Sequence, residues 1–401
     1  MHQSVDRFDL VVIGGGAAGF FSAINTPEGS KVLILEKNKR PLQKVKVSGG
    51  GRCNVTHFCF DPQKLVENYP RGSDFLLEPF GRFGPQQTID WFNQRGVSIK
   101  KESDGRMFPD TDSSQTIIDC FLNEARRKKV ELRLLSKVLD FENSDDGWLV
   151  RLENEEIRTS KLLIATGSDK HIWERLKAMS LDIIEPVPSL FTFHIEDSAL
   201  QGLTGTPFPE IVVRTKGLQS RGPGLITHWG MSGPGVLKLS AFGARVFFEK
   251  DYCFDINVDW LPRFSESDII NELKTEQASN PKKKVRNFTP LGLSKRFWEF
   301  ICNKSQVSEH QNWSETGKKH FKRITESLKK MSFEVNGKST FKDEFVTAGG
   351  ISLEEVDPKT FQSIKYSGLY FAGEVLDIDA VTGGFNFQAA WTGGWHVASS
   401  I

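Results

Sequence analysis

The chain has little of several features, and each shortage excludes a class of protein. Its 401 residues carry 52 Lys and Arg against 51 Asp and Glu, so the net charge gives no reason to expect a polyanion as the main partner. Its five cysteines are too few and too scattered for a disulfide scaffold, and none forms a CxxC zinc pair. We expect no metal site and a reducing, cytoplasmic compartment.

Long apolar runs are also missing. No run approaches the roughly 20 residues that cross a bilayer, and the opening MHQSVDRFDL lacks the apolar stretch of a secretory signal. We therefore expect no membrane partner. The 38% hydrophobic and 26% charged content is typical of a globular protein, and the length favours two or three domains.

The first 36 residues predict one compact βαβ unit. Residues 8–13 form a nearly continuous apolar run, as expected for a buried parallel strand. A GxGxxG pattern at Gly14, Gly16 and Gly19 follows, then a short helix to residue 24 and a second strand at 31–35. Gly14 allows the tight turn, Gly16 lets the backbone approach a pyrophosphate, and Gly19 allows close helix–strand packing. The helix N-terminus then favours the anion.

Glu36 ends the second strand, 22 residues after Gly14. A carboxylate there can accept hydrogen bonds from both hydroxyls of an adenosine ribose and repels a 2′-phosphate, which disfavours NADP. The motif alone does not separate NAD from FAD.

The C-terminal region favours the longer cofactor, FAD. Gly373-Glu374 closes a buried strand, and Thr382-Gly383-Gly384-Phe385-Asn386 precedes a last helix. This carboxylate could bind ribityl hydroxyls, and the helix dipole would stabilise reduced flavin. The alternative is a simple capped turn.

A third glycine-rich stretch, residues 48–56, reads SGGGRCNVT. Consecutive glycines suit a close backbone approach, and Arg52 could hold a phosphate or substrate carboxylate; the alternative is a surface loop. Cys53 and Cys59 could form a redox disulfide, but the spacing differs from that of flavin disulfide reductases. We expect Cys53 to be a small group against the flavin or a plain buried thiol, and we expect packing roles for Phe58 and Phe60.

Two further features are weaker. His228, in THWGMSGP, could be an acid or base, although a lone histidine is more often structural. Residues 281–286, PKKKVR, resemble a nuclear-import or phosphate-binding run, although in a near-neutral chain a solvated loop is the better explanation. The weak candidates for catalysis are thus Arg52, Cys53 and His228, and no catalytic residue is assigned.

The distribution of apolar, glycine-rich and charged segments along the sequence predicts a discontinuous α/β fold. A Rossmann-type FAD-binding domain, 1–190 plus 340–401, is interrupted by a β-barrel-like piece, 191–260 plus 331–339, and a helical subdomain, 261–330. Many short β-like runs lie between 191 and 254, and 265–330 is charged and amphipathic.

The motifs together resemble a known family. IGGGAAG, SGGGRCNVT, GRMFP, THWGMSGP, TAGGISLEEVDPKT and GLYFAGEVLDIDAVTGGFNFQAAWTGG occur in order along nearly the whole chain. The sequence resembles the BaiN-like flavoproteins, also called aminoacetone-oxidase-like NAD(P)/FAD-dependent oxidoreductases.

The resemblance implies an FAD-dependent oxidoreductase with a non-covalent cofactor. It implies contacts to FAD from Gly14, Gly16, Ala17, Ala18, Glu36, Lys37, Gly50, Gly51, Asn54, Thr56, Val138, Ala165, Thr166, Gly167, Gly373, Glu374, Gly384 and Asn386; we add Gly19 and Phe385 from the motifs. The sequence departs from the family pattern at Phe385, where a tyrosine is usual, and lacks the usual closing Ala-Gly near Ser400.

Several activities remain open. The family resemblance offers oxidation of a small amine or reduction of an activated C=C bond, with NAD(P)H as a candidate electron donor. The alternatives are an RNA-associated, tRNA-modifying-like flavoprotein that uses Lys282–Lys284 and Arg286, or a non-catalytic flavin-binding protein. We expect a small-molecule substrate over nucleic acid, and a monomer or homodimer.

Overall fold

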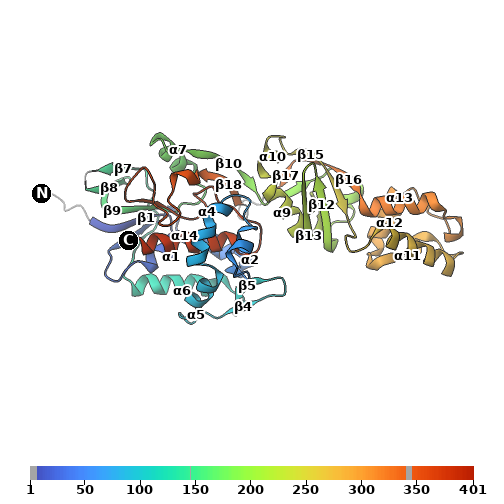
Figure 1. Ribbon diagram of the computed structural model, residues 1–401, viewed down its shortest axis with the longest axis horizontal. Helices are drawn as coiled ribbons and strands as arrows, with labels where there is room; N and C mark the ends of the chain where they lie inside the picture. The colour runs from blue at the N-terminus through green and yellow to red at the C-terminus, as the bar shows by residue number, and fades with distance from the viewer. Residues whose placement is uncertain (1–6, 145, 340–345) are drawn as a thin grey trace. The chain divides into compact units, whose positions relative to one another are not determined.

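The computed structural model describes residues 7–144, 146–339 and 346–401 (Figure 1). The chain forms two compact units: unit 1 holds Met1–Ser189 with Phe341–Ile401, and unit 2 holds Leu190–Thr340. The domain boundary expected at residue 340 falls within 340–345, outside the described residues. In the described part of the chain, no helix is both long and apolar enough to cross a membrane.

Unit 1 is built on a parallel sheet, which confirms the Rossmann-type α/β fold. The parallel strands are β6 (Glu131–Arg133), β2 (Val32–Leu35), β1 (Arg7–Ile13), β9 (Glu156–Ile164) and β19 (Leu369–Phe371), in that spatial order. In β1 and β2, the side chains are buried almost continuously, as expected for strands of a sheet that is covered on both faces. β19 is the strand that returns after unit 2 and completes this sheet.

Antiparallel pieces surround this sheet. The first half of β9 pairs with β8 (Gly147–Arg151), which pairs with β7 (Asp140–Ser144). A second sheet contains β3 (Thr56–His57), β5 (Arg106–Pro109) and β4 (Ile99–Lys101), and β10 (Ile183–Ser189) pairs with β18 (Val346–Ile351).

Two helices from opposite ends of the chain pack together beneath the sheet (Figure 1). They are α1 (Ala17–Asn25) and α14 (Phe385–Ser399). A methyl group at Gly394 would lie 2.8 Å from the carbonyl oxygen of Ala18, so the helices approach more closely than a side chain permits. An aromatic cluster of Phe21, Trp91, Phe121 and Trp391 fills the adjoining core. The other helices of unit 1 are α2 (Gln43–Gly51), α3 (Pro62–Val66), α4 (Ser73–Arg82), α5 (Pro85–Asn93), α6 (Ser114–Arg127), α7 (Lys170–Ala178) and the 3₁₀ turn η4 (Leu353–Glu355).

Unit 2 contains an antiparallel sheet that curls on itself. Its order is β16 (Met331–Asn336), β15 (Cys253–Asp259), β12 (Pro207–Thr215), β13 (Leu218–Thr227), β14 (Gly230–Ser232), β11 (Thr192–His194) and β17 (Lys338–Ser339). The two end strands, β16 and β17, are separated in the chain by Gly337 alone, so the sheet must bring its ends together. This arrangement fits the expected barrel-like piece.

The helices of unit 2 differ in part from expectation. The range 191–254 contains α8 (Ser198–Gln201), α9 (Pro234–Phe242) and α10 (Ala244–Phe248), where only strands were expected. Gly233, at φ 96°, ends the strand, and Pro234 occupies the first turn of a helix, where proline is favoured. The segment expected to be helical contains α11 (Glu266–Ser279), α12 (Lys295–Lys304), α13 (Lys318–Lys329) and the short turns η1 (Val285–Asn287), η2 (Pro290–Gly292) and η3 (Trp313–Glu315).

The helical segment and the sheet of unit 2 share one core. The rings of Phe208 and Trp260 lie 4.6 Å apart, and Trp260 lies 5.0 Å from Phe297 of α12. The expected separate subdomain, 261–330, is therefore part of the same compact unit as the sheet.

We predict that Gly394→Ala destabilises unit 1 by about 1–3 kcal/mol, because the new methyl group overlaps the backbone of α1. The loss should outweigh the gain of about 1 kcal/mol in helix propensity. Gly81→Ala is the matched control, since Gly81 lies in α4 with nothing within 4 Å of the added atom. Urea denaturation measures both variants, and equal stability of Gly394→Ala and wild type would contradict this packing.

Candidate functional site

The turn after β1 has the geometry that the glycine pattern predicted. A side chain at Gly14, which has φ 111°, would overlap the carbonyl of Ala165 at the end of β9, and one at Gly19 would overlap the carbonyl of Gly14. Gly16 is the N-cap of α1, and a methyl group there would meet nothing within 4 Å. No side chain caps this helix. The N-terminus of α1, with Ala17 and Ala18 in its first turn, therefore faces open space, as an anion site requires.

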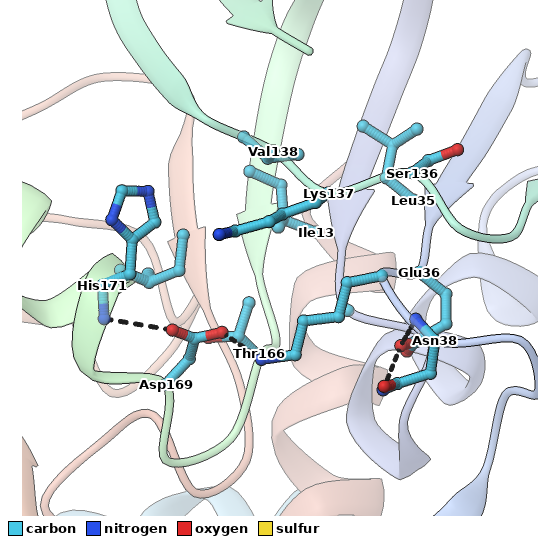
Figure 2. Close-up of a pocket in the computed structure, with 13 residues that line it drawn as sticks. Ile13, Leu35, Glu36, Asn38, Ser136, Lys137, Val138, Thr166, Asp169 and His171 are labelled. Carbon is cyan, nitrogen blue, oxygen red and sulfur yellow. Dashed lines mark hydrogen bonds and ion pairs between the residues drawn. The ribbon is translucent and has the colours of Figure 1, made fainter. Parts of the chain in front are cut away.

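Glu36 is fixed at the carboxyl end of β2. It is buried, and its Oε2 accepts a hydrogen bond from the backbone N–H of Gly15 at 2.9 Å. Its Oε1 accepts hydrogen bonds from the backbone and side-chain nitrogens of Asn38 at 2.7 and 2.6 Å (Figure 2). With two acceptor sites on each oxygen, Oε1 is fully used and Oε2 can accept one further hydrogen bond. The carboxylate is therefore held rigidly for a polyol.

A pocket lies beside Glu36 at the switch point between β1 and β9 (Figure 2). Ligands bind at such positions in open α/β sheets. It is lined by Ile13, Gly14, Leu35, Glu36, Lys37, Asn38, Ser136, Lys137, Val138, Thr166, Asp169, His171 and Ile172. Of the predicted cofactor residues, Gly14, Glu36, Lys37, Val138 and Thr166 thus meet here.

An ion pair borders this pocket. Lys37 Nζ lies 2.6 Å from Asp169 Oδ2, and Asp169 also caps α7. Burial opposes ionisation of Asp169, but Lys37 and the N–H groups of α7 lower the pKa of the Asp169 carboxyl below its usual value. Lys37 is thus paired with Asp169. Two other predicted cofactor residues, Ala165 and Gly167, lie between the end of β9 and Asp169 in the chain.

The second predicted helix N-terminus is also present. Gly383 and Gly384 have φ values of 138° and 91°, and Gly384 is the N-cap of α14, again without a side-chain cap. A methyl group at Gly384 would lie 2.5 Å from the carbonyl oxygen of Thr56 and 2.9 Å from Asn54 Oδ1. The SGGGRCNVT segment and the turn before α14 are therefore in direct backbone contact.

The SGGG segment forms the kinked end of α2. Ser48 is extended, and Gly49, Gly50 and Gly51 have φ values of 56°, 67° and 85°. A side chain at Gly49 would crowd Asn54, but one at Gly50 or Gly51 would meet nothing within 4 Å. The last two glycines thus expose their backbone to open space.

Several predicted side chains already have internal partners. Thr56 Oγ1 donates to buried Gln388 at 2.6 Å, and the Asn386 amide bonds both backbone groups of Ala380, at 3.0 and 3.1 Å. Glu374, next to Gly373, pairs with Lys44 and accepts a hydrogen bond from Thr347 N at 2.9 Å. These side chains shape the loops, which leaves mainly backbone groups to face a ligand.

His57 and Tyr69 belong to this region and were not predicted from the sequence. His57 Nδ1 bonds the Gly383 carbonyl at 3.1 Å, and its ring stacks on Phe385 at 4.6 Å. Burial lowers the pKa of His57, although the Gly383 contact opposes this. Tyr69 is buried, and its hydroxyl donates to the Phe385 carbonyl at 2.6 Å. The position of His57 directly after Thr56 was the only signal in the sequence.

The weak catalytic candidates fit that role poorly. Arg52 Nη1 bonds Glu102 at 2.6 Å, and its guanidinium stacks on Phe108. Cys53 is fully buried, which raises the pKa of its thiol to about 12, and Cys53 and Cys59 are both free thiols. His228 is exposed in unit 2, and its ring contacts that of Trp229 at a tilt of 42°.

The expected packing roles of Phe58 and Phe60 are wrong. They are 45% and 41% exposed, and they contact each other edge to face at 4.6 Å. Both follow a short strand at the rim of the small sheet, where the chain leaves the core.

Solved structures and curated proteins resemble this chain over its full length. The fold matches 3-ketosteroid delta1-dehydrogenase from Sterolibacterium denitrificans with a TM-score of 0.52 and 13% identity, covering 98% of this chain and 99% of that one. A ribosomal RNA dihydrouridine synthase of Escherichia coli is 29% identical, over 99% of this chain and 98% of the relative. A 3-dehydro-bile acid delta(4,6)-reductase of Clostridium scindens is 25% identical, over 96% of each chain.

A family model covers almost the whole sequence. The model described as the HI0933-like protein Rossmann domain matches residues 8–400, from the start of β1 to the end of α14. The match includes both glycine-lined helix N-termini and all of unit 2. The chain therefore belongs to the HI0933-like Rossmann-domain family.

Proposed function

We propose that the protein is an FAD-dependent oxidoreductase that reduces a C=C bond conjugated to a carbonyl group. One observation carries the cofactor assignment: two uncapped helix N-termini, those of α1 and α14, belong to the same unit as a pocket that holds a fixed carboxylate. A dinucleotide has an anionic pyrophosphate, a ribose and a second ring system that match these three features. Membership of the HI0933-like family supports this assignment.

The residues present fit FAD. Gly16, Gly50 and Gly51 leave open the space that side chains would fill, and Glu36 Oε2 can accept one further hydrogen bond, from a ribose hydroxyl. The N-terminus of α14, at Gly384 and Phe385, would stabilise negative charge on the pyrimidine edge of a flavin. Bound FAD supplies the hydride; the protein binds, orients and shields it.

The relatives favour reduction of a polarised double bond. The names of the two curated relatives describe different substrates, a uridine in RNA and a bile acid derivative. The uracil C5=C6 bond and the double bonds of a 3-oxo steroid are both conjugated to a carbonyl. In either case hydride adds to the alkene carbon farther from the carbonyl, and a proton from solvent adds to the alkene carbon nearer to it.

The turn before α14 must be held in place for this chemistry. His57 is the half-buried titratable side chain that contacts the turn before α14. Its lowered pKa keeps the imidazole neutral near pH 7, so it holds the Gly383 carbonyl through Nδ1–H without adding positive charge. We assign it a positioning role.

A uridine in RNA is a second, narrower candidate substrate. The relatives of that name align over almost the entire chain, at 29% and 27% identity. Oxidation of a small amine and a purely flavin-binding role are the remaining alternatives. NAD(P)H is the proposed electron donor for the reduction.

Anaerobic titration with NADPH and NADH tests this function. We expect the flavin absorbance to bleach with one of them, and the bleached flavin to be reoxidised on mixing with a uracil-containing RNA or a conjugated enone. A flavin that is reduced by an amine and stays oxidised with both nicotinamides would support the oxidase instead. Bleaching without reoxidation by either acceptor would contradict the proposed reduction.

We predict that Gly16→Val abolishes FAD binding and leaves the fold intact, because the side chain enters only the space at the N-terminus of α1. Gly317→Val is the matched control, since Gly317 is the N-cap of α13 with similar dihedral angles and equally open surroundings. The flavin content of the purified proteins measures the effect. Full flavin content in Gly16→Val would exclude this helix from the cofactor site.

We predict that His57 makes stability depend on pH. Its folded-state pKa is lowered, so the unfolded chain binds more protons below about pH 6.5, and the stabilisation it provides declines as the pH falls. The difference in urea midpoint between wild type and His57→Asn should therefore be larger at about pH 7.5 than at about pH 5. An equal difference at both pH values would contradict a half-buried, neutral imidazole at His57.

A further inference from the structure

The positive charge of the chain is concentrated in one segment of unit 2. Residues 261–330 carry 15 Lys and Arg against 8 Asp and Glu, an excess of 7, whereas the whole chain holds 52 against 51. The rest of the chain therefore has an excess of 6 negative charges. The net charge of the whole chain is therefore near zero although this segment is basic. A basic segment of this kind is expected in a protein that binds a polyanion.

Part of this charge gathers where two loops run side by side. The backbone N–H of Trp313 donates to the Lys283 carbonyl at 3.0 Å, and that of Ser314 donates to the Pro281 carbonyl at 2.8 Å. Helix α13 begins four residues after Ser314, at Lys318. We call five lysines, three from the first loop and two from the start of α13, the basic tip: Lys282, Lys283, Lys284, Lys318 and Lys319.

The lysines of the basic tip are available to a partner. All five are exposed. Lys284 donates to His310 Nδ1 at 3.2 Å, and among the described residues no carboxylate pairs with the other four. Arg286, which the sequence grouped with this run, instead turns inward to Asn303 and to the Val307 carbonyl.

The start of α13 adds to the positive potential. Its N-cap, Gly317, has no side chain, and the first turn contains Lys318 and Lys319 and no acidic residue. Helices usually place Asp or Glu there, because the N-terminus itself carries partial positive charge. Two lysines at this position oppose the helix dipole, so they are better explained by a bound anion than by stability.

The basic tip lacks the apolar groups of a membrane-binding surface. None of the large exposed hydrophobic side chains of the described chain falls within residues 261–330, all of which the structure describes. A peripheral membrane site combines basic residues with exposed apolar ones. A phosphate backbone in water needs the cations alone.

We propose that the basic tip binds the phosphate backbone of an RNA. This inference rests on the narrower form of the proposed function, in which the reduced C=C bond belongs to a uracil of RNA. The tip provides affinity without reading sequence, because lysines contact phosphates as point charges. In this proposal, unit 2 holds the RNA and unit 1 carries out the reduction of the C=C bond.

The test measures binding of a fluorescein-labelled, uracil-containing RNA hairpin to the oxidised holoprotein by fluorescence anisotropy, between about 50 and 200 mM salt. The variant Lys282→Ala/Lys283→Ala/Lys318→Ala/Lys319→Ala removes four charges of the tip. The matched control, Lys177→Ala/Lys216→Ala/Lys250→Ala/Lys359→Ala, removes four exposed lysines elsewhere. Flavin content and the rate of bleaching by the nicotinamide are measured on all three proteins.

We expect the tip variant to bind RNA at least about tenfold more weakly at low salt and to lower the slope of log K against log salt by about 4. The control should keep wild-type binding, and all three proteins should keep their flavin and its reduction. Equal weakening in the control, or no salt-dependent binding by wild type, would overturn the proposal. The proposal would also be overturned if the tip variant bound RNA as wild type does but no longer bound vesicles that contain anionic phosphatidylserine. Failure of flavin reduction in all three would instead reject the proposed function.

Discussion

The candidate site depends on backbone segments that approach more closely than side chains allow. A methyl group at Gly14, Gly19, Gly384 or Gly394 would collide with the backbone of another segment. These contacts join β1 to β9, α1 to β1, the SGGGRCNVT segment to the start of α14, and α1 to α14. Segments more than 300 residues apart in sequence thereby form one surface, and glycine is the only residue that permits it.

This constraint explains why the site presents backbone groups more than side chains. The side chains of Thr56, Asn386 and Glu374 form internal hydrogen bonds that hold loops in place, and Arg52 is paired with Glu102. The groups left facing open space are the N–H groups at the starts of α1 and α14 and the backbone at Gly50 and Gly51. Such a site can bind an anionic dinucleotide firmly and leave the chemistry to the cofactor.

Much of this could be predicted from local sequence. The apolar run before Gly14, the glycine spacing and Glu36 together specify a βαβ unit whose parts are adjacent in the chain. The returning strand β19 has the same buried pattern. Features that depend on distant partners could not be predicted: the contact of His57 with Gly383, the pairing of Arg52 with Glu102, and the exposure of Phe58. Helix α9 was missed because Gly and Pro, which suggested turns between strands, here begin a helix.

The central claim is that one cofactor spans both the pocket at Glu36 and the N-terminus of α14. The most direct measurement is the affinity of flavin-free protein for FAD and for FMN, determined by quenching of flavin fluorescence. FMN lacks the adenosine that the Glu36 pocket is expected to bind. The account predicts FAD binding tighter than FMN binding by at least about 100-fold, since several hydrogen bonds of about 1 kcal/mol each are lost. Equal affinity for the two flavins would contradict it.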